Sequence, residues 1–511
     1  MKKKTLFFLL LIVLGGIFTR FYKLSELLYF MGDEEIVGFT SKRIIIDQRP
    51  ILIGSIELPG GLHTAPYFYY LVALIMVLTK FEPIWEGIVA SIIGVLTIWL
   101  VFYVGKQLFN QKIALLACLF YSLSFLVSIY NRYLSLLTFM PVASLLTYLC
   151  LYKIIAKKNY FWVYPLSFSL LLSVQGEGSG FSLPILTIIL WLLLKLKLSQ
   201  KVLRAVGIFI FFHFPLLFFE IRHQFYLTKN LLRLLTPSDS KGINFAAPLN
   251  SIIMIPKTLA RMFFLSGPND VVKQIFPCEG YVIQRQMVNP FLIVLAILVI
   301  FYCFIQAFKN KKVGGLKIIS WHLIVIAAGV FIFNLLIPGH SHEWFFNVFF
   351  PGFALLSGYF FISLSKKNIL KLITIGFVLF FVFRNINDTF TANNIFGYSK
   401  KKQAVELALS EVKSQKFYLD STGECFGYGG YRYLFWVFGN EPTHSPLMES
   451  WGGWLFEKPN QEKPDLGVVM VNYSPFEPKQ FYQTLEEYFK KTTNRKSFGE
   501  LEVLIVRDKN Y

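Results

Sequence analysis

Three adjacent carboxylates, Asp33, Glu34 and Glu35, are the residues of this sequence best suited to chemistry. They follow the first long apolar run and an aromatic turn, so we expect them at the surface of a membrane. A carboxylate placed there can take the proton of an attacking hydroxyl group, and such general-base catalysis typically contributes about 10²–10⁴-fold. The alternative is structural, because acids also stabilise the N-terminus of a helix, where Asp33 would be the cap.

Two other groups of polar residues could bind a substrate or a metal ion. Glu57 and His63 stand near the end of the polar segment that carries the acids, and His340, His342 and Glu343 stand together much later. These ligand types fit Zn²⁺ or a similar ion. A histidine at a membrane interface is about as often a hydrogen-bonded polar group without such a role. The sequence therefore leaves a divalent metal ion open and establishes no cofactor.

Arg132 stands at the end of an apolar run. Its guanidinium could bind phosphate oxygens in a bidentate manner. It could equally extend along the helix end to reach lipid headgroups. Both interpretations stay open at this stage.

The elements that must position these residues are apolar helices. The 511-residue chain is 55% hydrophobic and only 16% charged, whereas soluble domains are about 25% charged. A membrane span needs about 20 apolar residues, and several runs reach or approach that length: Leu6–Phe18, Ile84–Val104, Phe291–Phe308, Leu316–Ile337 and Ile369–Phe383. We therefore predict an all-α polytopic membrane protein with 11 spans, or about 13 if one was missed.

The net charge of +20 indicates membrane topology rather than nucleic-acid binding, because many Lys and Arg residues lie in short loops between apolar runs. Cytoplasmic loops carry such an excess of positive charge. The pattern predicts a multi-pass protein of the cell (inner) membrane with a cytoplasmic N-terminus. It places the loops 20–66 and 220–289 and the C-terminal region outside. The run Tyr67–Thr79 is too short for a full crossing, so we expect it to pack at the outer side.

The chain divides into a transmembrane domain over residues 1–390 and a small extracytoplasmic α/β domain over residues 391–511. The second part is charged, has turns and contains no long apolar run. Helical spacing and short apolar stretches predict its elements. The helices are Ser399–Gln415 and Pro478–Lys491, and the strands are Lys416–Leu419, Leu466–Val471 and Leu501–Val506.

The order of the motifs along residues 1–390 resembles the bacterial branch of the protein O-mannosyltransferase family (glycosyltransferase family 39). That branch includes the aminoarabinose transferases of lipid A and has the GT-C membrane fold. The matching motifs are the Asp33-Glu34 pair after the first span, the turn Leu58–Tyr67 that opens an aromatic helix, the basic turn Tyr103–Phe109, the arginine in Tyr130–Tyr133, the element Ser173–Glu177, and Gly339–Trp344 before Phe350-Pro351. Glu177 stands where relatives commonly have histidine, which puts the role of that position in doubt.

The resemblance implies a membrane glycosyltransferase that takes a sugar from a polyprenyl-phosphate carrier, with inversion, at the outer face. The acceptor would be a hydroxyl group of a lipid, a glycan or a protein. The family analogy makes Asp33 the base and has Glu34 orient the acceptor or a metal. Arg132, His340 and His342 would bind the donor phosphate. Glu57, His63 and Glu343 would belong to a substrate or metal site.

Two other functions remain open: a flippase or transporter, and a ligase, of lipid-linked saccharides. A transporter places ionisable residues inside its spans near the midplane, whereas the notable acids and histidines here stand at span ends. A ligase commonly has one very large outside loop late in the chain. The acidic loop directly after the first span favours the transferase.

Overall fold

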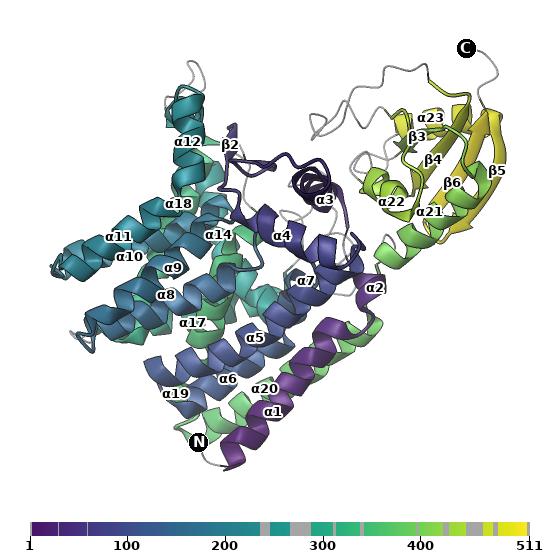
Figure 1. Ribbon diagram of the computed structural model, residues 1–511. Coiled ribbons are helices and arrows are strands. Elements are labelled where there is room, and N and C mark those ends of the chain that lie inside the picture. Colours follow the sequence, from purple (N-terminus) through teal and green to yellow (C-terminus); the bar gives the residue numbers. More distant parts are fainter. Residues whose placement is uncertain are drawn as a thin grey trace.

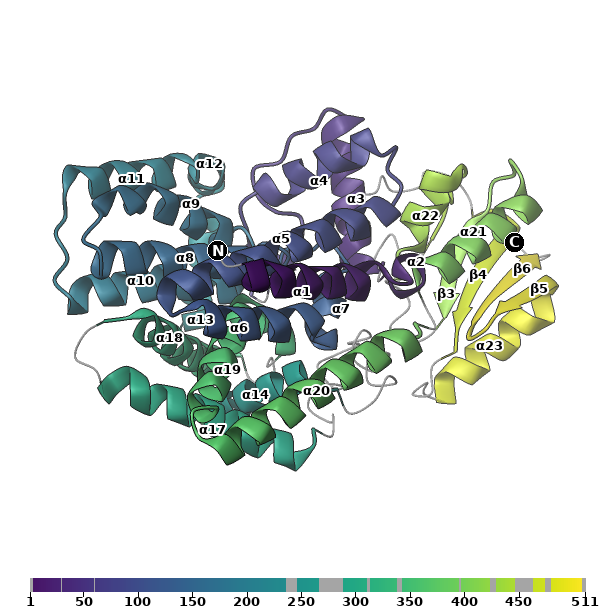
Figure 2. The same cartoon turned by 90° about the horizontal axis from the view of Figure 1, so that it is seen from below.

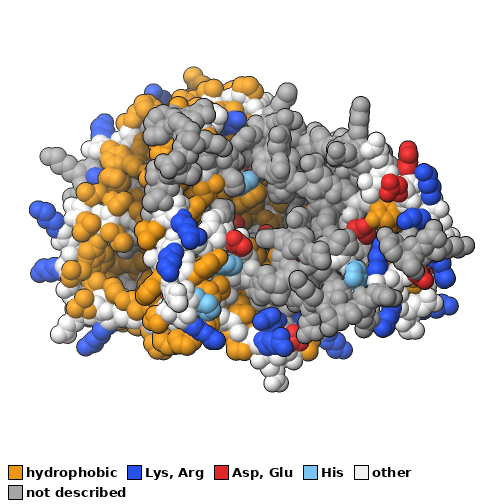
Figure 3. All heavy atoms as spheres, turned by 90° about the horizontal axis from the view of Figure 1, so that it is seen from above, with side chains coloured by type: hydrophobic (Ala, Val, Ile, Leu, Met, Phe, Trp, Pro, Cys, Tyr) orange, Lys and Arg blue, Asp and Glu red, His pale blue; other side chains and the backbone are white. Residues whose placement is uncertain are grey.

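Apolar helices make up most of the chain in the computed structural model, and a small α/β unit lies at one end of them (Figure 1). The structure describes residues 3–28, 30–58, 60–235, 246–265, 288–309, 313–337, 342–394, 397–422, 429–445, 463–473 and 479–507. Seen from above, apolar side chains cover much of one side of the helical part, with Lys and Arg at its rim (Figure 3). The predicted class, a mostly helical multi-span membrane protein with a small mixed C-terminal unit, is confirmed.

Within the described ranges, 6 helical segments are long and apolar enough to cross a membrane, or up to 7 if one bent pair counts as a single span. The six are α1 (Lys3–Phe21), α5 (Ile84–Leu108), α17 (Pro290–Lys309), α18 (Gly315–Leu336), the segment Glu343–Leu364 formed by η3 (Glu343–Phe349) and α19 (Phe350–Leu364), and α20 (Asn368–Thr391). The bent pair is α11 (Gln200–Phe211) and α12 (Phe214–Arg222), at 55°.

Shorter apolar helices account for the larger number of spans predicted from the sequence. They are α4 (Tyr67–Leu78), α6 (Gln111–Leu123), α8 (Met140–Ile155), η1 (Tyr160–Trp162) with α9 (Val163–Val174), and η2 (Gly178–Phe181) with α10 (Ser182–Leu193). The apolar run that contains α6 breaks at Ser124, whose side chain caps the short helix α7 (Phe125–Tyr130). At about 1.5 Å per residue, the 12 residues of α4 cover less than the membrane core.

Small residues let the central helices approach closely. A Cβ added to Gly358 of α19 would lie 2.8 Å from the Ile113 carbonyl oxygen of α6, and one added to Gly105 of α5 would lie 3.1 Å from Ala114 Cα. Membrane helices associate through such small residues because lipid provides no hydrophobic driving force between them. Helix α6 is therefore held between α5 and α19.

The segments that connect the membrane helices carry the elements around the site. The predicted loop 20–66 contains α2 (Leu24–Leu27), α3 (Gly32–Ile45) and a hairpin of β1 (Glu57–Leu58) and β2 (Leu62–His63). The described parts of 220–289 contain α13 (Tyr226–Leu235) and α14 (Ala246–Phe263). Helices α2 and α3 lie near the end of α1 (Figure 1), whereas α14 packs against α17 and α18 within the bundle.

The C-terminal unit is built on a 4-stranded mixed sheet with the order β3-β4-β6-β5. Strands β3 and β4 are parallel, and β6 pairs antiparallel with both β4 and β5. The chain order is α21 (Tyr398–Val412), β3 (Tyr418–Thr422), α22 (Tyr431–Phe438), β4 (Leu466–Asn472), α23 (Lys479–Lys491), β5 (Thr492–Phe498) and β6 (Leu501–Arg507). The predicted helices and three strands are present within a few residues, but α22 and β5 were missed.

The C-terminal unit does not have a separate core on the side that faces the bundle. One buried apolar cluster joins Phe30, Val37 and Phe39 of the α3 region with Tyr433 and Phe435 of α22. Both views place α22 beside α3 and α21 beside α2 (Figures 1 and 2). The position of α3 therefore depends on contacts from both ends of the chain.

Candidate active site

A cavity of about 160 Å³ lies between α3, the end of α7, η2 and η3. Three acidic side chains line it: Asp33, Glu34 and Glu177. Aromatic and apolar side chains form the remaining wall, namely Tyr130, Tyr133, Trp344, Val37, Ile56, Ile129, Leu134, Leu136 and Leu137, together with Ser135. A cavity that combines apolar walls with a few convergent polar groups is the usual form of a small-molecule site.

The first turn of α3 gives its three acids different surroundings. Glu34 is buried, and its carboxylate accepts a hydrogen bond of 2.9 Å from the Met31 N–H, so it caps the helix. Glu35 is buried in an ion pair with Arg432 of α22, whose Nε lies 2.7 Å from its carboxylate. Asp33 is exposed, and within the described ranges no hydrogen bond or ion pair occupies its carboxylate. The structural alternative for Asp33, a helix cap, is therefore filled by Glu34.

The environment of the cavity keeps its acids protonated to unusually high pH. Burial raises the pKa of Asp33 to about 6, although the carboxylate remains accessible from the cavity. Burial and the negative charge of Asp33 raise the pKa of Glu34 to about 8. Burial and Asp33 raise the pKa of Glu177 to about 8, against a hydrogen bond from Trp344 that favours its charged form. Strongly perturbed acids in one cleft are typical of a functional site.

Glu177 is a site residue that the sequence analysis quoted but did not select. It directly precedes η2, and the Trp344 side chain hydrogen-bonds to its carboxylate. Glycines make this turn possible, since a Cβ at Gly180 would overlap the Ser173 carbonyl. The available signal was an acid in the segment Ser173–Glu177 between two apolar runs.

Arg261 of α14 is a buried cation near this cavity that the sequence analysis missed. Its Nε lies 2.5 Å from Glu343 Oε1, and both side chains are almost completely buried. Its Nη1 is buried and makes no hydrogen bond to any described residue. Tyr130, which lines the cavity, lies within electrostatic range of both Arg261 and Glu343. Glu343 therefore forms a buried ion pair with Arg261, and its predicted place in a substrate or metal site stays a prediction.

Arg132 is not among the residues that line the cavity, although Tyr130 and Tyr133 on either side of it are. Its Nη2 donates a 2.6 Å hydrogen bond to the Thr19 carbonyl, and its guanidinium carbon lies 5.7 Å from the centre of the Phe125 ring. The side chain is buried, so it does not extend to lipid headgroups either. This hydrogen bond ties the end of α7 to α1, and Nε is buried without a hydrogen bond to any described residue. The phosphate-binding role of Arg132 stays a prediction.

The remaining predicted residues occupy other places. Glu57 and His63 face each other across the β1–β2 hairpin, and His63 Nδ1 lies 2.8 Å from the Gly54 carbonyl oxygen. The ring of His342 stacks on Trp344 at 3.9 Å between ring centres, which places it behind the cavity wall. His340 lies outside the described residues.

No group of three His, Cys, Asp or Glu residues in the described ranges is arranged to hold a metal ion. The predicted Glu57/His63 and His342/Glu343 combinations each lack a third described ligand. The cavity acids would offer carboxylate oxygens, which suit hard cations such as Mg²⁺ or Mn²⁺ rather than Zn²⁺.

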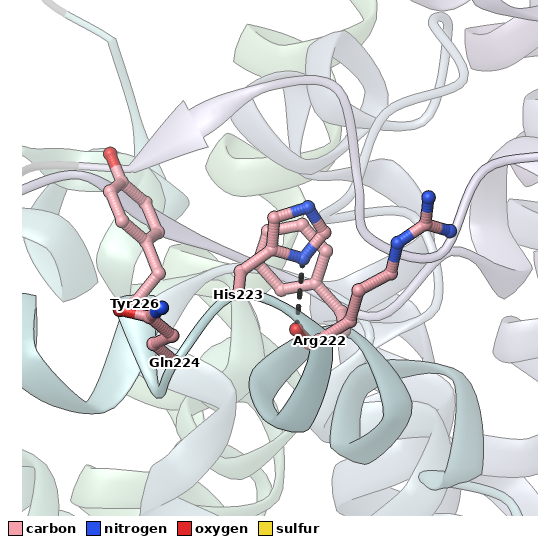
Figure 4. Close-up of a pocket in the computed structure, with 5 residues that line it drawn as sticks. Arg222, His223, Gln224 and Tyr226 are labelled. Atoms are coloured by element: carbon pink, nitrogen blue, oxygen red, sulfur yellow. Dashed lines mark hydrogen bonds between the residues drawn. The ribbon is translucent and has the colours of Figure 1, made fainter.

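A second, more open hollow of about 490 Å³ lies at the corner between α12 and α13 (Figure 4). Phe219, Arg222, His223, Gln224 and Tyr226 line it. The His223 ring stacks on Phe219 and its Nδ1 lies 3.0 Å from the Phe219 carbonyl oxygen. This hollow has no acid in its lining, so it does not offer the base that the carboxylate cavity offers.

Fold and cavity together define a multi-span membrane protein with an acidic cavity beside its helical bundle. Residues 63–219 match the family described as dolichyl-phosphate-mannose-protein mannosyltransferase. The resemblance stated from the motifs is thereby confirmed over that segment, which includes Glu177 but ends before Arg261. Comparison with curated protein sequences returns no significant match.

Two solved structures share the fold. ArnT from Cupriavidus metallidurans, bound to undecaprenyl phosphate, is 12% identical with a TM-score of 0.50, and the match covers 97% of each chain. The Archaeoglobus fulgidus oligosaccharyltransferase, in complex with Zn and sulfate, is 12% identical with a TM-score of 0.51, and the match covers 91% of this chain and 68% of that one. At this level of identity the likeness establishes the architecture, and the chemistry must be argued from the cavity.

Proposed function

We propose that this protein transfers a sugar from a polyprenyl-phosphate carrier to an acceptor hydroxyl group on the outer face of the membrane. The observation that carries the proposal is the cavity in which Asp33 is accessible and unpaired beside two further acids. The match of residues 63–219 to a lipid-phosphate-sugar transferase family supports this donor class. The ArnT structure with undecaprenyl phosphate shows that this fold can hold such a lipid.

In the proposed reaction, the acceptor oxygen attacks the anomeric carbon of the donor sugar. Its proton passes to the Asp33 carboxylate as the new carbon–oxygen bond forms. The bond between the anomeric carbon and the phosphate oxygen breaks, and the polyprenyl phosphate leaves with the electron pair. Attack from the face opposite the phosphate inverts the anomeric centre. A pKa of about 6 leaves Asp33 mostly ionised at neutral pH and close enough to that pH to act as an efficient base.

The other cavity residues have roles that follow from their chemistry. Glu177, held by Trp344, can accept a hydrogen bond from a sugar or acceptor hydroxyl group. Glu34 keeps the first turn of α3 in place and adds a second acid beside the base. Tyr130 and Tyr133 provide flat apolar faces against which a sugar ring can pack.

The leaving phosphate needs a cation in a water-poor site. Arg132 and Arg261 each have one buried nitrogen without a described hydrogen-bond partner. We favour Arg261, because it lies within electrostatic range of Tyr130 in the cavity wall. Its ion pair with Glu343 fixes the guanidinium plane before the donor binds. His342, stacked behind the wall, remains a secondary candidate.

The test is transfer of radiolabelled sugar from a panel of polyprenyl-phosphate sugars by the purified protein in detergent, with total membrane extract as acceptor. The wild type should move label to an acceptor, and Asp33→Asn should lose about 10²-fold or more of this activity. Glu57→Gln, a change in an exposed acid of the same predicted loop, is the matched control and should retain activity. Full transfer by Asp33→Asn would remove the base role. Failure with every donor, despite binding of a lipid-linked saccharide, would favour the flippase or ligase.

A further inference from the structure

We propose that Lys401, a residue of the C-terminal α/β unit, is a positioning residue for Asp33, so that this unit is a working part of the active site. The claim that Lys401 affects catalysis rests on the proposed function. The claim that Lys401 holds the backbone at the start of α3 does not depend on it.

Lys401 reaches out of α21 to the segment directly before α3. Its Nζ donates hydrogen bonds of 2.7 Å to the Phe30 carbonyl and 2.8 Å to the Gly429 carbonyl, and it lies 3.3 Å from Met31 Sδ. The side chain is completely buried, and the Tyr431 ring centre lies 5.2 Å from Nζ. One ammonium group therefore joins the start of α3 to the start of α22.

The backbone segment that Lys401 contacts also determines where the Asp33 side chain points. Met31 is the N-cap of α3, and its N–H bonds to Glu34. Asp33 lies between these two residues, in the first turn. Because the capping hydrogen bond and the Lys401 contacts act on the same three-residue segment, movement of Phe30 and Met31 would carry Asp33 with it. Displacements of about 1 Å can cost about 10²-fold in rate.

Charge complementarity reinforces this contact. Burial lowers the pKa of Lys401 to about 7, Glu34 and Glu35 lie within electrostatic range and act against this shift, and Glu35 also pairs with Arg432. Asp33 on α3 and Glu86 on α5 lie within range of Glu34. Arg432 thus offsets the buried charge of Glu35, and Lys401 lies close enough to the first turn of α3 to favour the charged form of Glu34.

The fit between the two parts leaves little freedom to slide. The Tyr433 ring lies directly against Gly38 of α3, with no room there for a Cβ. The Tyr433 hydroxyl donates a 3.0 Å hydrogen bond to the Phe81 carbonyl, and its N–H donates a 3.3 Å hydrogen bond to Glu35. These contacts favour a permanent interface over transient docking.

Lys402 provides a matched control on the same helix. Its Nζ lies 3.1 Å from Glu82, and both side chains are partly exposed. It also links the C-terminal unit to the bundle, but its partner precedes α5 and lies outside the cavity. Loss of Lys402 therefore weakens the interface without releasing the start of α3.

The first measurement is hydrogen exchange by mass spectrometry on full-length wild-type, Lys401→Met and Lys402→Met proteins. We expect amide exchange of the peptide over residues 30–38 to rise at least about fivefold in Lys401→Met and to stay near wild type in Lys402→Met. Equal exchange of this peptide in both variants would overturn the proposal. This readout does not depend on any transferase activity.

The second measurement is transfer with the donor that the wild type uses. We expect Lys401→Met to lower kcat about tenfold with little change in the donor KM, because the base is misplaced while the donor contacts persist. Lys402→Met should keep the wild-type kcat. Faster exchange with an unchanged kcat would leave Lys401 a structural residue and overturn its role in positioning. A wild type without transfer would defeat the proposed function, and the exchange data alone would still decide whether Lys401 fixes α3.

If Lys401→Met does not fold, Arg432→Lys gives a milder version of the same comparison. It keeps the charge opposite Glu35 and removes one of the two nitrogens that contact that carboxylate. The peptide over residues 30–38 should again exchange faster than in Lys402→Met, and no difference would count against the proposal.

Discussion

At the scale of single residues, three neighbouring acids of α3 make three different kinds of contact. Glu34 closes the helix N-terminus, Glu35 joins the C-terminal unit, and Asp33 faces the cavity. The division follows from helix geometry, because consecutive residues point about 100° apart around the axis. A single substitution in this run therefore tests one task at a time.

Stability should decrease with rising pH because of the cavity acids. Their folded-state pKa values are raised, to about 6 for Asp33 and about 8 for Glu177. A carboxyl with a raised pKa contributes stability that is fully present below its unfolded pKa and is lost as pH rises through its folded pKa. We therefore expect the Tm of the detergent-solubilised protein to fall between about pH 4.5 and pH 8.

Replacing single acids by uncharged glutamine tests this expectation. Glu177→Gln should raise the Tm at pH 8 by about 2 °C or more and change it little at pH 4.5, where the wild-type carboxyl is already protonated. Glu57→Gln, a change at an exposed position of the β1–β2 hairpin, should leave the dependence of the Tm on pH unchanged. A Tm of Glu177→Gln that follows the wild type across the whole pH range would contradict the assigned environment of Glu177.

Variants of Arg261 can distinguish a role in donor binding from a role in protein stability. Arg261→Met leaves Glu343 buried without its partner, and breaking such a pair typically costs about 3–5 kcal/mol. The double variant Arg261→Met/Glu343→Gln removes the unpaired charge, so we expect it to recover much of the lost stability. If Arg261 binds the donor phosphate, the double variant should still show a donor KM raised about tenfold or more. Recovery of the wild-type KM together with stability would restrict Arg261 to a structural role.

At the scale of elements, the sequence was informative where a local pattern decides the structure. The apolar runs predicted α1, α5, α17, α18 and α20, and short apolar stretches predicted β4 and β6. Strand β5 was missed because its sequence, TTNRKSF, is polar and largely exposed, as is typical of an edge strand. Nothing in those seven residues indicates a strand until β6 provides the partner.

The site shows the same limit. Asp33 and Glu34 were found because three acids in a row stand out directly after an apolar run. Arg261 and Glu343 are 82 positions apart, and neither has an unusual neighbourhood in the sequence, so only the fold brings them together. Arg132 was chosen for its place at a span end, but its direction depends on the packing of α7 against α1.

The close approach of α6 and α19 gives a prediction at this scale. Gly358→Leu would force its side chain against the Ile113 backbone, which lies 2.8 Å from the position of a Cβ. Overpacking of this kind typically costs about 1–3 kcal/mol, so we expect a lower Tm and less folded protein. Gly376→Leu on α20, where no atom lies within 4 Å of a Cβ, is the control and should behave as the wild type. Equal stability of the two variants would show that α6 and α19 are not packed as the structure has them.

At the scale of the whole molecule, the arrangement suits the proposed reaction between a membrane-held donor and a polar acceptor. The cavity is lined by residues of α3, the end of α7 and η3, and the α/β unit packs beside α3 (Figure 1). A lipid carrier could remain among the helices while its sugar reaches the acids. Such a division requires that the cavity and the C-terminal unit lie on the same side of the membrane.

The side of the membrane can be tested with single cysteines. The positive loop charges predict a cytoplasmic N-terminus and an outside C-terminal unit. In a background with Cys278 and Cys425 changed to serine, the exposed positions Ser410→Cys and Lys157→Cys report on the two sides, since the three other cysteines are buried. A maleimide that cannot cross the cell (inner) membrane should label Ser410→Cys in cells in which that membrane is intact. It should label Lys157→Cys only after that membrane is permeabilised. The reverse pattern would place the cavity on the cytoplasmic face, and the donor would then have to present its sugar on that side.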